Sequence, residues 1–170
     1  MGMGILLISV VVGAGVFLFL FLFPVGVLSL SLGDETVILL RKVKSGDTFR
    51  LAYLHSVARS DVRELFIIDS QYRLVLVETR FQGQGTGLPY NLAEGEKLHR
   101  EGDWFRITGM RRVFPSIFWR VQSQWQNRFR FREETEINLS ATMGNGLIRI
   151  EAREMNYLSW MGMIFRRMIS

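Results

Sequence analysis

The first 33 residues of the chain contain no charged side chain, and this constrains the fold more than any other feature. Asp34 is the first charged residue, and between Ile5 and Phe23 only Ser9 carries a polar side chain. An apolar stretch of about 20 residues matches the hydrocarbon core of a bilayer. A buried core helix of this length would show a polar face, which is missing here. The sequence therefore predicts one membrane-spanning helix within an anchor at residues 1–32.

A cleaved signal peptide is the alternative interpretation of this segment. Signal peptides carry basic residues before an apolar region of about 7–15 residues and a small-x-small cleavage site. Here the first four residues lack a basic side chain, and Ser29 and Ser31 form only a weak cleavage motif. These features favour an uncleaved anchor. Within it, Ser9 and Gly13 have the small-xxx-small spacing that permits docking against another membrane helix.

All charged residues follow the anchor, so the net charge of +5 belongs to the remaining chain. We expect one domain at residues 33–154 and a tail at 155–170. A basic domain beside a bilayer favours anionic headgroups, an acidic partner or an anionic small molecule as ligand. Arg41, Lys42 and Lys44 favour a cytoplasmic domain by the positive-inside rule, whereas long domains are translocated largely regardless of charge. Both orientations stay open on this evidence.

Alternation of apolar and polar residues dominates after the anchor and predicts short strands. The predicted strands are 36–43, 48–57, 62–69, 72–81, 104–108, 119–131, 137–141 and 147–152. Many short strands with frequent turns predict an all-β fold, an antiparallel sandwich or barrel-like domain. Gly144-Asn145-Gly146 predicts a hairpin between the last two strands, because Asn and Gly tolerate positive φ.

Residues 119–131 alternate over their whole length and predict one long strand or a hairpin bent near Ser123. The alternation puts Arg128, Arg130 and Arg132 on the face opposite the aromatic residues. Bases cannot stack among these arginines, so nucleic acid is not expected as a partner. A solvated face, or one that docks on headgroups or a partner, is the interpretation that we favour.

The C-terminal tail has a helical rather than an alternating pattern. Its apolar residues cluster on one side of a helical wheel, with Arg166 and Arg167 near its end. This predicts a short amphipathic helix. The helix either lies in the membrane interface, docking through Trp160 and the two arginines, or packs on its own domain.

His55 and Glu64 are the most informative polar residues in the predicted strands. A four-residue turn at 58–61 would place His55 opposite Glu64, where the carboxylate would raise the pKa of the imidazole. A structural His–Glu pair and recognition of an anionic ligand are the two interpretations. Ser56 points to the opposite face from His55, which argues against a serine nucleophile. With two histidines and no cysteine, neither a metal site nor a cofactor is expected.

Several short motifs resemble a bacterial family, the domain of unknown function 1850, whose members are typically encoded beside TAXI-type TRAP transporter genes. The motifs are Tyr53-Leu54-His55-Ser56-Val57, Glu64, Glu78-Thr79-Arg80-Phe81, Gly85-Thr86-Gly87-Leu88-Pro89 and Gly102-Asp103-Trp104-Phe105. The resemblance spans about residues 37–152. It implies an extracytoplasmic accessory module with a signal or anchor and no established reaction. The shared candidate binding residues are His55, Ser56, Glu64, Glu78, Thr79, Gly85, Gly87 and Pro89.

The chain departs from the family pattern at Ala58, where many relatives have Glu, in residues 119–132 and in the tail. We expect a noncatalytic accessory protein of a TRAP/TAXI-type transporter, single-pass in the inner membrane, with a periplasmic domain. It would bind integral-membrane partner subunits and the lipid bilayer. A structural or assembly subunit of a larger integral-membrane complex is the alternative. A hydrolytic or metal-dependent enzyme is less favoured, because no catalytic group is assembled in the sequence.

Overall fold

The computed structural model describes the backbone of residues 2–57, 59–83 and 92–169, with side chains between residues 10 and 166 of these ranges. The chain begins with helix α1 and continues through eleven strands, two further α-helices and one 3₁₀ helix. In chain order these are α1 (Gly2–Leu22), β1 (Pro24–Leu32), β2 (Val37–Lys42), β3 (Thr48–Leu54), β4 (Asp61–Ile68), β5 (Leu74–Gln82), β6 (Lys97–Glu101), β7 (Trp104–Phe114), β8 (Ser116–Val121), η1 (Ser123–Trp125), β9 (Arg128–Phe131), β10 (Ile137–Asn138), α2 (Leu139–Met143), β11 (Gly146–Asn156) and α3 (Tyr157–Ile169).

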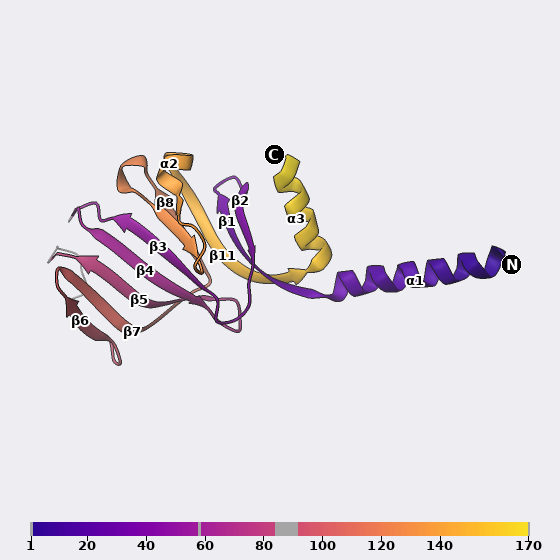
Figure 1. Cartoon of the computed structure of the whole chain (residues 1–170), viewed down its shortest axis with the longest axis horizontal. Helices are drawn as coiled ribbons and strands as arrows, with labels where there is room; N and C mark the ends of the chain where they lie inside the picture. Colours follow the sequence, from indigo (N-terminus) through magenta and orange to yellow (C-terminus); the bar gives the residue numbers. More distant parts are fainter. Residues whose placement is uncertain (1, 58, 84–91, 170) are drawn as a thin grey trace.

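The strands form two antiparallel sheets, so the expectation of a mostly β fold is confirmed. The smaller sheet has the order β2-β1-β11-β8, and the larger has the order β10-β9-β3-β4-β5-β7-β6. Figure 1 shows the two sheets facing each other, with α1 projecting from the domain and α3 at the side of the smaller sheet.

One apolar core joins the two sheets. Leu30 and Ile150 of the smaller sheet and Phe49 and Phe129 of the larger one are fully buried in it. The Phe49 ring stacks on Phe66 and on Phe129, with centroid distances of 4.9 and 5.8 Å. The predicted alternation in β9 is thereby explained, because its phenylalanines enter the core and its arginines face outward.

Strand β1 corrects the predicted boundary of the anchor. Residues 24–32 were expected to belong to the membrane segment, but they pair with β2 and β11 in the smaller sheet. Leu28 and Leu30 face the core, while Val25 and Val27 are covered from the other side by α3. A strand that is buried on both faces has a continuous apolar sequence. For this reason the sequence pattern could not separate it from the preceding helix.

Helix α1 exposes its apolar side chains. Between Val10 and Leu22, the exposed large apolar residues have between 49% and 65% of their surface accessible. Among the residues whose side chains are described, which begin at Val10, we find no helix with the length and apolarity to cross a membrane.

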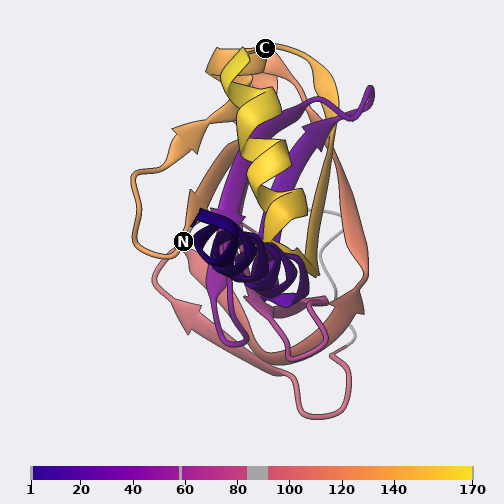
Figure 2. The same cartoon turned by 90° about the vertical axis from the view of Figure 1, so that its right-hand side faces the viewer.

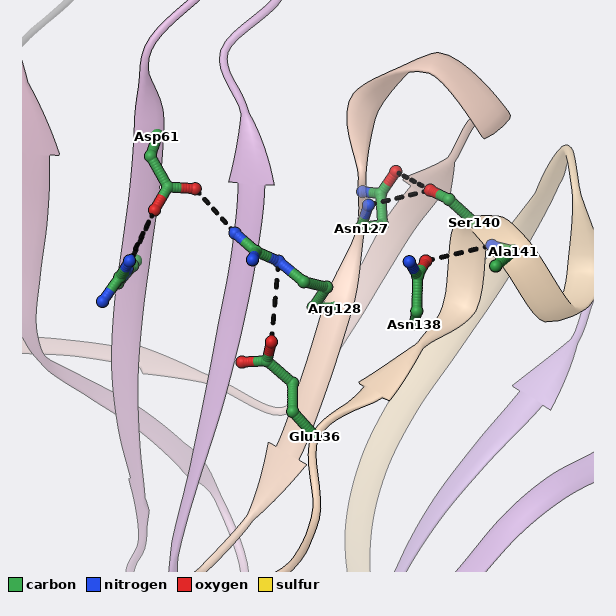
Figure 3. Close-up of polar contacts among 8 residues, drawn as sticks. Asp61, Asn127, Arg128, Glu136, Asn138, Ser140 and Ala141 are labelled. Atoms are coloured by element: carbon green, nitrogen blue, oxygen red, sulfur yellow. Dashed lines mark hydrogen bonds and ion pairs between the residues drawn. The ribbon is translucent and has the colours of Figure 1, made fainter.

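The predicted hairpin around Gly144-Asn145-Gly146 is wrong. Residues 137–141 divide into β10 and α2, and β11 pairs with β1 and β8 instead. Asn138 begins α2, since its side-chain oxygen accepts a hydrogen bond from the Ala141 N–H at 3.0 Å (Figure 3). Gly144 ends the helix with a φ of 71°. The glycine is therefore required at a helix end and not in a two-strand turn.

Residues 119–131 bend near Ser123, as one of the two interpretations predicted, but they do not form a hairpin. Strand β8 ends in the smaller sheet and β9 starts in the larger one. The buried side chain of Asn127 stabilises the crossing, accepting from the Gln122 N–H at 3.1 Å and from the Ser140 hydroxyl at 3.2 Å. The Ser140 hydroxyl oxygen in turn accepts from the Asn127 N–H at 2.8 Å (Figure 3).

Candidate functional site

The β3–β4 hairpin has a different register from the predicted one, and this separates His55 from Glu64. Leu51 lies opposite Glu64 and Leu54 lies opposite Asp61, so residues 55–60 connect the two strands. His55 begins this connection, where its N–H donates to the Ser60 carbonyl at 2.9 Å. The predicted His55–Glu64 pair is therefore wrong. A connection longer by two residues changes each cross-strand neighbour and keeps the same side chains inside.

Glu64 instead has Tyr53 as its partner, on the inner face of the larger sheet. Burial raises the pKa of the Glu64 carboxyl, while the hydrogen bond from the Tyr53 hydroxyl and the charge of Arg112 act to lower it. Burial and the neighbouring Glu64 raise the pKa of Tyr53 well above its ordinary range. The Tyr53 ring also packs edge-on against Trp119 of the smaller sheet, at 6.2 Å between centroids. The pair therefore lies between the two sheets.

The outer face of the larger sheet carries a row of arginines that crosses neighbouring strands. Arg63 lies opposite Arg80, and Arg80 lies opposite Arg106. On the other side Arg63 lies opposite Ala52, which in turn lies opposite Arg128. Directly opposed residues of antiparallel strands share one face. We call Arg63, Arg80, Arg106 and Arg128 the arginine row.

Asp61 joins two members of this row. One carboxylate oxygen of Asp61 accepts from Arg128 Nη2 at 2.7 Å, and the other lies 2.9 Å from Arg63 Nη2. Glu136 approaches Arg128 from the opposite side, with 3.7 Å between Oε1 and Nε (Figure 3). The Arg63 guanidinium also lies over the Trp104 ring, 4.7 Å from its centroid. These contacts hold the guanidinium groups in fixed positions along the sheet.

Glu78 and Glu101 join the other two arginines. Glu101 lies 2.6 Å from Arg80 Nη2 and 3.2 Å from Arg106 Nη1. Glu78 lies between the same two arginines, at 3.5 Å from Arg80 Nε and 3.9 Å from Arg106 Nε. The row thus consists of two carboxylate-linked pairs, Arg63 with Arg128 and Arg80 with Arg106.

The arginine row stays partly accessible despite these ion pairs, because 51% of the Arg63 side chain, 36% of Arg80, 32% of Arg106 and 26% of Arg128 are exposed. Arg130 lies opposite Arg50, and both share the exposed Glu133 at 3.5 Å. Guanidinium groups recognise carboxylate and phosphate oxygens. The face is therefore suited to binding an acidic surface. In the described part of the chain, no group of three His, Cys, Asp or Glu residues is arranged to hold a metal ion.

The structure brings three of the sequence-predicted residues to this face, namely Glu78, Arg128 and Arg130. Glu64 and Thr79, which lie opposite each other on β4 and β5, point to the interior. Arg132 lies after β9 and forms a separate ion pair with the buried Asp47. His55 and Ser56 lie in the β3–β4 connection. Gly85, Gly87 and Pro89 lie outside the described residues.

The predicted docking residues of α1 and α3 whose side chains are described do not form one common surface. Gly13 lies on α1 with open space around it, and the side chain of Ser9 lies outside the described residues. Trp160 packs toward the smaller sheet, where the Lys42 ammonium lies 3.7 Å from its ring centroid. Arg166 is exposed near the end of α3, and the side chain of Arg167 is not among those described.

Sequence reasoning missed most of the arginine row and its carboxylates. Arg63, Arg80 and Arg106 occupy polar positions of alternating strands, so their outward direction was readable. Their alignment across the sheet depends on the register of several strand pairs, which no single strand reveals. Asp61 was missed because it was assigned to the turn, whereas it is the first residue of β4.

The fold and this face define a class: a small, mostly β domain of two antiparallel sheets with an ion-paired outer face, behind an N-terminal helix. The model of the family described as a domain of unknown function (DUF1850) matches residues 49–139, more than half of the chain. The protein belongs to this family. The match covers the larger sheet from the second residue of β3 onward and also β8 of the smaller sheet, whereas β1, β2 and β11 lie outside it. It includes residues 119–132, which we had expected to depart from the family. No curated protein and no solved structure matches the chain.

Proposed function

We propose that the protein is a membrane-anchored, noncatalytic accessory protein that binds a partner protein through the outer face of its larger sheet. The proposal rests mainly on the arginine row. It lies in the part of the chain that the family shares, and carboxylates hold its guanidinium groups in place. A face on which carboxylates hold arginines in place favours a partner with a complementary charge pattern, and such complementarity gives specificity more than raw affinity.

The anchor is part of the proposal and is supported by two observations. The first 33 residues lack a charge, and the described side chains of α1 are apolar and exposed. An exposed apolar surface of this extent marks a site of contact with a membrane or another protein. We propose that α1 enters the inner membrane as a single span with the domain on the periplasmic side, the side that the family resemblance implies.

We propose a TRAP/TAXI-type transporter as the system that the protein serves, a choice that follows from the family resemblance. The geometry adds which surface would meet the transporter. Acidic groups on a transporter subunit would engage the terminal nitrogens of the arginine row, while Asp61, Glu78 and Glu101 would select against a partner with misplaced carboxylates.

A structural subunit of a larger integral-membrane complex is the second candidate. The observation that favours it is the open space around Gly13 and Gly15 on α1. Small residues on a membrane helix allow another helix to approach closely. In this role α1 would make the main contact, and the arginine row would be secondary.

Affinity purification of the tagged full chain from native membranes, followed by mass spectrometry, tests these proposals. The key variant is Arg63→Gln/Arg80→Gln. The matched control, Arg120→Gln/Arg153→Gln, removes two exposed arginines from the smaller sheet. We expect a transporter subunit to co-purify with the parent and the control, and to be lost from the arginine-row variant.

Three outcomes would contradict parts of the proposal. Equal recovery of the partner by both variants would remove the arginine row from the interface. Recovery of a different integral-membrane assembly would favour the second candidate. A parent chain that brings down no membrane subunit would overturn both.

A further inference from the structure

Helix α3 is firmly attached to the domain by one of its sides. Tyr157, Trp160 and Ile164 pack on the outer face of the smaller sheet, against the buried cluster of Val25, Val27 and Leu40. The Lys42 ammonium lies over the Trp160 ring, and the Asn156 side chain accepts from the Ser159 N–H at 2.8 Å near the start of the helix. This confirms packing on its own domain, one of the two interpretations of the tail.

The exposed side of α3 carries two large apolar residues, Met161 and Phe165, beside Ser159, Gly162 and Arg166. Met161 and Phe165 lie one turn apart with 46% and 64% of their surface accessible. A helix that packs on a domain by one side normally presents polar residues on the other. The sequence of α3 contains no acidic residue, and its charged residues are Arg166 and Arg167. The exposed side therefore combines apolar and basic character.

Helix α3 lies next to the end of α1 and crosses its axis, and this determines how α3 is oriented relative to α1. The Tyr157 N–H donates to the Phe23 carbonyl at 3.0 Å, directly after the end of α1, and the two helices are in contact. Figures 1 and 2 both show α3 running across the axis of α1 and not along it. In Figure 2, which looks from the side on which α1 projects, α3 lies in front of the sheets. The side of α3 that faces away from the sheet lies toward the direction in which α1 projects.

We propose that α3 rests on the surface of an anionic lipid bilayer, with Met161 and Phe165 in the boundary between headgroups and acyl chains. This inference rests on the proposed anchoring by α1. A helix that crosses the axis of a membrane-inserted helix lies along the membrane plane. Apolar residues beside arginines are the features of an interfacial helix, and the arginines favour anionic headgroups.

This contact fixes the orientation of the domain. Helix α3 covers the outer face of the smaller sheet, and the arginine row lies on the outer face of the larger one. With α3 on lipid, the arginine row points away from the bilayer. A tether at α1 alone would leave the domain free to turn, whereas two contacts present the row to a partner in one orientation.

Single-cysteine labelling tests the inference. The sequence contains no cysteine, so each introduced cysteine is the single site of labelling. Phe165→Cys reports on α3, Val12→Cys reports on α1, and Val113→Cys is the control on the larger sheet. All three positions are exposed, so the label should not disturb folding. Each full chain is labelled with bimane and reconstituted in vesicles of phosphatidylcholine and phosphatidylglycerol. It is then quenched by nitroxide-bearing lipids or by aqueous iodide.

We expect lipid quenching at positions 12 and 165, and iodide quenching at position 113. If position 12 is lipid-quenched while position 165 behaves like the control, the anchor stands and the lipid contact of α3 is refuted. If position 165 is shielded from both quenchers, a protein such as a second copy covers α3, and the inference fails. If position 12 is not quenched by lipid, the anchor fails and the inference fails with it.

Arg166→Gln and neutral vesicles test the headgroup part of the inference. An arginine at an anionic surface changes partition by about fivefold. We expect Arg166→Gln to shift the partition of position 165 toward the undocked state by about fivefold in anionic vesicles, and to have no effect in pure phosphatidylcholine. Lipid quenching at position 12 should be the same in both vesicles. An equal effect of the substitution in both lipids would contradict a role for anionic headgroups.

Discussion

Replacing Asp61 by Asn removes one charge from the arginine row without changing its shape. Asp61 is only 15% exposed, and its pair with Arg128, which is 26% exposed, is shielded from solvent. Hydrogen bonds to charged groups contribute about 1.5–3 kcal/mol to stability. The pair with Arg63 is worth about 0–1 kcal/mol, because Arg63 is 51% exposed. We expect Asp61→Asn to lower the free energy of unfolding by about 2 kcal/mol.

Urea unfolding of the full chain in detergent micelles, followed by tryptophan fluorescence, measures this change. Double-mutant cycles with Arg128→Gln and with Arg63→Gln separate the two pairs. We expect a coupling energy of about 1–2 kcal/mol with Arg128 and less than about 1 kcal/mol with Arg63. A loss below about 0.5 kcal/mol for Asp61→Asn, or equal coupling to both arginines, would refute the assigned contacts.

Three further substitutions test the interior. Burial raises the pKa of Glu64 above its ordinary 4.5, so the parent should lose stability as the pH rises from 4.5 through the raised pKa. The urea midpoint of Glu64→Gln, measured from pH 4.5 to 8, should depend less on pH than that of the parent. Burial acts to raise the pKa of Asp47, but hydrogen bonds from Arg132 and the Lys44 N–H outweigh it and lower the pKa below 3.8. The stabilisation that ionised Asp47 gives the folded state is therefore present above pH 3.8 and is lost as the pH falls below it. Asp47→Asn should therefore cost about 1–3 kcal/mol at pH 7 and progressively less in acid. A Cβ at Gly26 would collide with the Tyr72 ring, so Gly26→Ala should cost about 1–3 kcal/mol in urea unfolding, whereas Gly33→Ala, which faces open space, should be nearly neutral.

The mostly β architecture could be predicted because each strand carries its own alternation. In β9 the sequence Arg-Phe-Arg-Phe alone shows which residues enter the core. Strand β1 could not be separated from α1, because α3 covers its outer face and removes the polar half of the pattern. The uncharged N-terminal sequence thus forms two different elements, a projecting helix and a strand that is buried on both faces.

The candidate site was less predictable than the fold, because it depends on contacts between strands. The length of the β3–β4 connection decides whether Glu64 meets His55 or Tyr53, and the sequence of that connection contains no strong turn signal. The arginine row requires the registers of β3, β4, β5, β7 and β9 together. The glycines near residue 145 indicated a backbone position with positive φ, but they did not show whether it belonged to a hairpin turn or to the end of a helix.

Extraction of native membranes with alkaline carbonate tests most directly whether α1 anchors the domain. Carbonate removes proteins that are held only by surface contacts, so α3 alone would not retain the chain. We predict that the full chain stays in the membrane pellet and that Val12→Asp/Leu18→Asp releases it, because charges within a bilayer are costly. Release of the parent chain into the carbonate supernatant would show that α1 does not anchor the domain.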